Sequence, residues 1–171
     1  MFNRFLFFQI ILIAVLSVFQ AFIFSRFNIG DQYNPFIYLL WLLFFPNSKS
    51  YYLYLILAFI LGISVDILMG TGGLNAFACV FVAMIRNFLL RFTMGGQKDL
   101  EMLRWNESNF LQILVYIFLG TFVHQFILFY LEKFTINAYF FLTLMHIFIS
   151  SLITTLCVFI FFNLFKNRIV E

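Results

Sequence analysis

Three titratable side chains lie inside apolar runs of this sequence and are the residues best suited to chemistry. They are Asp66, His124 and His146. An aspartate with two histidines can bind a metal ion or pass protons, but no ligand pair at a three- or four-residue spacing accompanies the histidines. The chain also has no H-E-x-x-H, G-x-S-x-G, paired carboxylate or glycine-rich phosphate loop. We therefore expect a protein without enzymatic activity, metal or cofactor.

Asp66 lies among small residues in the stretch LGISVDILMGTGGLNAF, residues 61–77. At about 100° per residue, Ala58, Gly62, Asp66, Gly70 and Gly73 fall within an arc of roughly 120° on one helix face. Small residues allow close helix approach, so this face is predicted to pack against protein, inside the bundle or against a partner. Two interpretations of the carboxylate stay open. It caps the following turn or reaches headgroup water, or it forms a polar contact for a partner or for a small-ligand pocket open to the outer side.

A second group of polar side chains is predicted to form an intramembrane cluster in the outer half of the bilayer. Its members are His124 in the run 110–131 and Thr143, His146, Ser150 and Thr154 in the run 138–165. The four in the later run lie within about 80° of one another on a helix. At about 1.5 Å per residue, Asp66, His124 and His146 lie roughly 6, 10 and 12 Å below the outer helix ends. These groups either bond to backbone and across helices or line a pocket.

The elements that position these residues are long apolar runs. Of the 171 residues, 64% are hydrophobic and 10% are charged, more apolar surface than a soluble domain can bury. A membrane span needs about 20 apolar residues. The sequence predicts one all-α integral membrane domain over residues 1–171, with six transmembrane helices over 5–24, 33–45, 51–69, 74–92, 110–131 and 138–165. The second run is the shortest and lies between Pro35 and Pro46, so a short or tilted helix is expected there.

The distribution of lysine and arginine predicts the orientation. With a cytoplasmic N-terminus, seven basic residues fall on the inside and two on the outside, while Arg86 lies within the fourth run. The positive-inside rule then places both termini in the cytoplasm. The net charge of +3 comes from scattered residues and does not indicate nucleic-acid binding.

The inner polar segment 97–109 is the natural contact for cytoplasmic partners. It mixes charges with leucines and contains Lys98, Arg104 and Trp105. Two interpretations are open, a short interfacial helix with its tryptophan at headgroup level and an ordinary solvated loop.

The run GISVDILMGTGGLNAFACVFVAMIRNFLLR, residues 62–91, resembles the signature region of the rod shape-determining membrane protein family MreD. The shared pattern is a glycine, an aspartate four residues later, a glycine-containing break and a helix that starts with small residues. Here these positions are Gly62, Asp66, Gly73 and Ala76. The stretch HQFILFYLEKF, residues 124–134, resembles the end of the fifth helix of some members, and length, spans and charge bias agree across the chain.

The resemblance implies a non-enzymatic subunit of the bacterial cell-elongation machinery, which builds peptidoglycan. Its implied partners are the single-span protein MreC, the actin-like MreB filament, and RodA with its penicillin-binding transpeptidase, in addition to membrane lipid. The implied fold is similar to the substrate-binding subunits of energy-coupling-factor transporters. The resemblance transfers no catalytic residues.

Two other functions compete with this interpretation. The first is a vitamin-type ligand-binding subunit of an energy-coupling-factor transporter. Such subunits carry an A-x-x-x-A pattern in their first helix. Here Ala14 and Ala21 are seven residues apart, and Val18 occupies the position four residues after Ala14. The second is a lipid or ion translocator that uses Asp66 and the histidines as a proton relay. No charged pair spans the bilayer, which counts against a continuous path.

Overall fold

The computed structural model describes residues 2–24, 34–95, 105, 108–133 and 140–169, and every regular element in these ranges is helical. The elements are α1 (Phe2–Phe19), continued by the π-helical η1 (Gln20–Phe24), then α2 (Leu39–Phe44), α3 (Tyr51–Met69), α4 (Leu74–Met94), α5 (Phe110–Lys133) and α6 (Phe140–Ile169). Five helices in the described ranges are long and apolar enough to cross a membrane: 4–24 and the bodies of α3, α4, α5 and α6. The prediction of a multi-pass helical membrane protein is confirmed.

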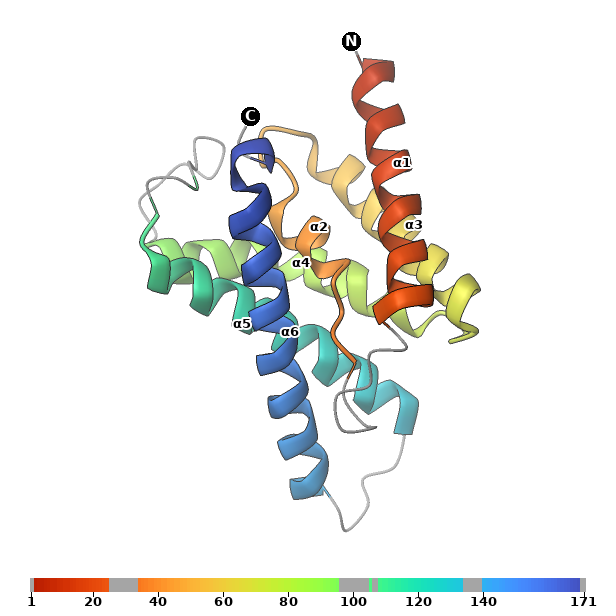
Figure 1. Ribbon diagram of the computed structural model, residues 1–171, viewed down its shortest axis with the longest axis vertical. Helices are drawn as coiled ribbons and strands as arrows, with labels where there is room; N and C mark the ends of the chain where they lie inside the picture. The colour runs from red at the N-terminus through yellow and green to blue at the C-terminus, as the bar shows by residue number, and fades with distance from the viewer. Residues whose placement is uncertain (1, 25–33, 96–104, 106–107, 134–139, 170–171) are drawn as a thin grey trace.

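The predicted second transmembrane helix is wrong in length. A helix over 33–45 was expected, but α2 contains only six residues, roughly 9 Å of helix. Pro46 explains its end, because a residue before proline is driven out of the helical region. Phe45 adopts φ −56° and ψ 138°, and the helix stops at Phe44. Figure 1 shows that the segment 34–46 nevertheless runs between the two ends of the molecule.

This central segment, residues 34–46, forms the middle of the core. Its side chains from Ile37 to Phe45 are buried apart from Leu40, and Tyr38, Leu39, Leu42 and Leu43 are completely covered. The long helices surround it, with α3 against α4, α4 against α5, α5 against α6, and α1 against α3. A largely non-helical segment at membrane depth is therefore enclosed by protein, the situation in which irregular backbone is tolerated there.

The outward faces of the long helices carry large apolar side chains. Phe7, Ile67, Phe88 and Phe141 are among the most exposed residues of the described chain. In water such a surface would drive aggregation, whereas in a bilayer it contacts lipid. The first turn of α1 and the last turn of α6 lie at the same end of the molecule (Figure 1).

Candidate functional site

The Asp66 carboxylate caps the start of the next helix. Its oxygens accept hydrogen bonds from the backbone N–H groups of Asn75 (3.0 Å) and Ala76 (2.8 Å), the second and third residues of α4. The Asn75 side-chain amide (3.0 Å) and the Thr71 hydroxyl donate as well. The position that would normally supply a cap is Gly73, which has no side chain. Asp66, from the preceding helix, takes that role, and its charge complements the positive end of the α4 dipole.

Gly62 lies at a close approach between α3 and the start of α4. A Cβ atom at this position would come within 2.7 Å of the Ala76 nitrogen and of the Asn75 carbonyl oxygen. Ala58, one turn earlier, is fully buried. The close approach predicted for this face occurs at Gly62, and the neighbour is the same chain's α4.

Gly70 and Gly73 do not belong to that helix face, so this part of the prediction is wrong. The helix ends at Met69, and Gly70 and Gly73 lie in the α3–α4 turn, residues 70–73. Both have positive φ, +69° and +96°, and a Cβ atom on either would meet nothing within 4 Å. They are glycines because this turn needs left-handed backbone, a local requirement that helical periodicity does not represent.

The polar contacts continue from Asp66 into the core. The Tyr38 hydroxyl donates to Oδ1 of the Asn75 side-chain amide (2.7 Å) and lies 3.0 Å from Nε2 of His124. Since the tyrosine proton is used on Asn75, His124 donates from Nε2 to the Tyr38 oxygen, which assigns its tautomer. The Cys79 sulfur lies 4.0 Å from the same nitrogen. Asp66, Asn75, Tyr38 and His124 are all buried and come from four different parts of the chain.

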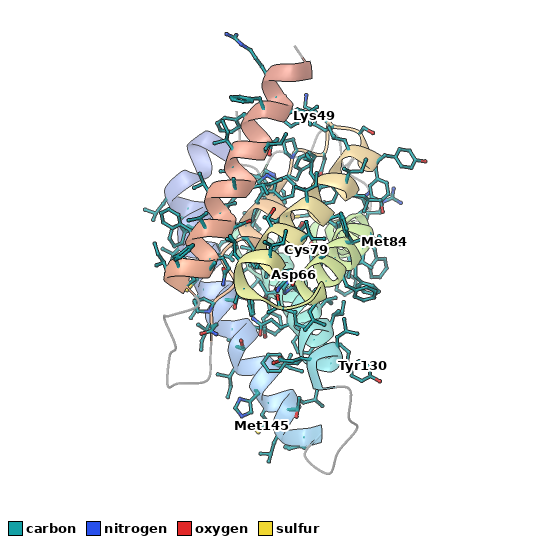
Figure 2. All side chains as sticks on the ribbon, turned by 90° about the vertical axis from the view of Figure 1, so that its right-hand side faces the viewer. Lys49, Asp66, Cys79, Met84, Tyr130 and Met145 are labelled. Carbon is teal, nitrogen blue, oxygen red and sulfur yellow. The ribbon has the colours of Figure 1, made fainter. Side chains whose placement is uncertain are left out.

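The predicted outer polar cluster divides into two groups. Ser150 and Thr154 are buried, and Thr154 accepts from the Gln125 amide (2.8 Å) next to His124. Thr143 and His146 are half-buried. Figure 2 shows Met145, the neighbour of His146, near the lower end of the molecule and well below Asp66. Ser150 and Thr154 thus belong to the buried polar contacts, and a common cluster with Thr143 and His146 stays a prediction.

Polar side chains from η1, α6 and α1 hold the first half of the central segment. Gln20 donates to the Pro35 carbonyl (3.1 Å) and accepts from the Ile37 N–H (2.9 Å). The Phe36 N–H points to the Thr154 hydroxyl at 3.5 Å. The Trp41 indole donates to the Gln9 amide oxygen at 2.6 Å. The contacts to the backbone of Pro35, Phe36 and Ile37 supply partners that an uninterrupted helix would have supplied itself.

Arg86 and two tyrosines hold the second half. Arg86 is 2% exposed; its Nε donates to the Leu43 carbonyl (3.0 Å) and the Tyr116 hydroxyl (3.2 Å), and its Nη2 to the Phe45 carbonyl (2.5 Å). Tyr116 also donates to the Leu43 carbonyl, and Tyr54 to the Leu42 carbonyl, both at 2.7 Å. The guanidinium thus stands at the negative end of α2, where free carbonyl groups and the helix dipole favour a cation. It also lies 5.0 Å from the Tyr54 ring centre.

Trp105 is buried in the protein, not exposed to lipid headgroups as the interfacial interpretation expects. It is 7% exposed, and its ring packs against Phe44 and Phe162 at centroid distances of 4.7 and 6.2 Å. The large Trp105 ring buries its apolar surface between α2 and α6. Lys98 and Arg104, with most of the segment 97–109, lie outside the described residues.

These contacts define a structural network. In the described part of the chain, no group of three or more His, Cys, Asp or Glu side chains could hold a metal ion. The carboxylate and the guanidinium each bind helix-end groups of the chain itself. We infer that the network fixes how the helices meet around the central segment.

Sequence reasoning missed several members of this network. Tyr38, Asn75 and Gln125 carried no pattern of their own, and Arg86 was recognised only as a residue inside a span. A usable signal was present for Arg86 and Gln20. A proline-bounded run too short to cross as a helix must leave backbone groups unpaired, so every polar residue at membrane depth is a candidate partner for them.

The fold and the network together define a multi-pass helical membrane protein whose buried central segment contains only one short helix. Comparison of this chain with protein-family models, with curated proteins and with solved structures found no match. A function must therefore be argued from the residues, their contacts and the resemblance that the motif at 62–91 carries.

Proposed function

We propose that this protein is a non-enzymatic scaffold subunit of the bacterial cell-elongation complex in the inner membrane, with both termini cytoplasmic. In this role it binds MreC, and links it to MreB and to RodA with its penicillin-binding transpeptidase. We further propose a fold of the kind found in the substrate-binding subunits of energy-coupling-factor transporters. The proposal rests on the resemblance of residues 62–91 to the MreD signature region.

The observation that carries the proposal is that this motif performs one connected structural task. Gly62 admits the start of α4, and the Asp66 carboxylate caps that start. The break at Gly73 provides the turn between them. A motif of this kind fixes how two helices meet and takes no part in a reaction. This favours a subunit that acts by binding other proteins on its surface.

The contacts also change where partners are expected to bind. Asp66 was a candidate for a polar contact with a partner helix, yet it is 4% exposed and its acceptors are used within the chain. Partner helices therefore meet the exposed apolar faces, and Asp66 influences them only through the fold. Cytoplasmic partners meet the inner end, to which Lys98 and Arg104 belong in the proposed orientation.

Affinity purification from the native membrane tests this function. The tagged protein is extracted in mild detergent, and co-purifying proteins are quantified by mass spectrometry against an equally tagged unrelated multi-pass protein. We expect enrichment of MreC, RodA and the transpeptidase. Recovery of the coupling subunits of an energy-coupling-factor transporter, with a small molecule bound, would show the proposal to be wrong and the transporter alternative right.

A variant separates binding from folding. Asp66→Ala should lower the yield of folded protein, but MreC recovered per folded molecule should stay at the wild-type level because the carboxylate faces inward. Ser64→Ala, which removes a hydroxyl that donates to the Ile60 carbonyl within the same helix, serves as the matched control for substitution in this part of α3. A selective loss of MreC from folded Asp66→Ala protein would instead assign the carboxylate to the partner interface.

A further inference from the structure

We propose that the α3–α4 turn, residues 70–73, lies inside the lipid bilayer, among the ester groups and upper acyl chains, and does not reach water. The turn and the exposed side chains beside it therefore have lipid as their neighbour. Three independent observations support the proposal, namely the exposed side chains, the backbone hydrogen bonds and the level of the turn.

The exposed side chains around the turn are apolar. Ile67 in the last turns of α3 is 75% exposed, and Phe77 in the first turn of α4 is 56% exposed. Between Lys49 and Arg86 the only charged residue in the sequence is Asp66, which is buried. Turns that reach water at a membrane surface normally carry polar or charged side chains and aromatic anchors. This surface lacks a charged group that would hold it in water.

Two of the four backbone N–H groups of the turn, and those of the first three residues of α4, are satisfied within the chain. The N–H groups of Gly70 (2.8 Å) and Thr71 (3.2 Å) donate to the Asp66 carbonyl, and that of Leu74 to the Thr71 carbonyl at 3.4 Å. The N–H groups of Asn75 and Ala76 donate to the Asp66 carboxylate. In water such donors would be solvated at no cost, whereas without water each unsatisfied donor costs several kcal/mol.

Two donors of the turn have no acceptor among the described residues, the N–H groups of Gly72 and Gly73. Lipid ester carbonyl oxygens can accept from them, which places the turn at the ester level and not at the bilayer centre. The burial of Asp66 thus has a physical purpose: its carboxylate replaces the water that would otherwise solvate the start of α4.

The level of the turn in the molecule agrees. Both views show the lower ends of α5 and α6 extending past the yellow α3–α4 turn (Figures 1 and 2). With 19 residues, α3 is roughly 28 Å long, slightly less than the hydrocarbon thickness of about 30 Å, and it is tilted relative to α6 (Figure 1). Helix α3 begins beside Lys49 at one membrane surface. Because it is tilted and of that length, it ends before it reaches the headgroups of the opposite surface.

Depth-dependent fluorescence quenching tests the proposal. Phe77→Trp is reconstituted in vesicles of lipids brominated on the acyl chains, and the contribution of the native Trp41 and Trp105 is subtracted using the parent protein. We expect strong quenching by the brominated lipids and little by aqueous acrylamide. The reverse pattern, with acrylamide effective and brominated lipid ineffective, would overturn the proposal.

Cysteine labelling provides a second readout that does not require a tryptophan at the site. A membrane-impermeant maleimide, present on both sides of the membrane, is reacted with Leu68→Cys and with Glu132→Cys at the exposed end of α5. Since maleimide needs a hydrated thiolate, Leu68→Cys should react at least about tenfold more slowly. Equal rates would place the turn in water and refute the proposal.

Discussion

At the scale of single residues, Asp66 answers the question that a carboxylate in an apolar run raises. The sequence left two interpretations open, a capping carboxylate and a polar contact for a partner or ligand. The observed contacts are those of a cap that acts between helices, because Gly73 at the capping position of α4 has no side chain. Such a residue is tolerated at membrane depth because all its contacts are with donors.

Removing this carboxylate should destabilise the protein. Asp66→Ala leaves the N–H groups of Asn75 and Ala76 without an acceptor, so we expect the free energy of unfolding to fall by about 1–3 kcal/mol. Ser64→Ala is the control, since the Ser64 hydroxyl only donates to the carbonyl of Ile60 one turn earlier. The measurement is thermal unfolding in detergent, and equal midpoints for the two variants would contradict the capping role.

Two helical glycines offer a matched test of close packing. Gly62→Ala would bring a methyl group within 2.7 Å of the Ala76 backbone nitrogen, which cannot move without shifting α4. Gly120→Ala would meet Leu43 Cδ2 at 2.5 Å, the end of a side chain that can change rotamer. We expect Gly62→Ala to lower the free energy of unfolding by about 1–3 kcal/mol, as overpacking does, and Gly120→Ala to cost clearly less. The reverse order in thermal unfolding would show that α3 and α4 are less tightly packed than described.

At the scale of elements, the central segment 34–46 explains why so many polar residues occur inside an apolar protein. Two prolines and a six-residue helix leave its backbone groups without partners from the segment itself. Gln20 and Thr154 reach its first half, and Arg86 and Tyr116 its second half. Side chains from helices far apart in the sequence thus replace the missing hydrogen bonds.

Arg86 is the residue on which this arrangement depends most. Arg86→Lys keeps the charge but replaces the planar fork by a single ammonium, which cannot serve the carbonyls of both Leu43 and Phe45 in the same geometry. We expect the free energy of unfolding to fall by about 1.5–3 kcal/mol, the contribution of a hydrogen bond to a charged group. Arg91→Lys, at an exposed position of the same helix, should be neutral. Equal thermal stability of the two variants would show that Arg86 does not hold the central segment through these carbonyls.

At the scale of the whole molecule, the crossing segment determines the topology. If 34–46 crosses as described, the chain has six crossings and both its ends face the same side, in agreement with the common end of α1 and α6 in Figure 1. The lysine and arginine distribution then predicts that this side is the cytoplasm. Whether the segment crosses is therefore testable by locating the two ends of the chain.

Reporter fusions measure this orientation. Green fluorescent protein fused at either terminus should be fluorescent, and alkaline phosphatase fused there should be inactive, because each reporter works on one side only. Alkaline phosphatase fused after Glu132, at the opposite end of α5, should be active. Termini on opposite sides would mean that residues 34–46 do not cross the membrane.

The features that the sequence predicted well are those that local composition controls. Long apolar runs have few alternatives to a membrane helix, so the residues 51–69 were assigned as α3 with the bounds that the structure has. The second run failed because a sliding count of apolar residues does not register that Pro46 forces Phe45 out of the helix. Gly70 and Gly73 failed because continuing a helical period past Met69 ignores the turn that glycine permits.

By itself, the sequence determined the class of this protein, the approximate places of its long helices and the presence of a carboxylate that needed a polar environment. Only the tertiary structure decided which environment that is. It joined Asp66 to the start of α4, His124 to Tyr38 and Arg86 to the end of α2, and it moved Trp105 into the core. The reason is physical. The gain from burying apolar groups and the cost of burying polar ones follow from the composition along the chain. The partner that offsets the cost for a polar group is decided by which distant segments pack together.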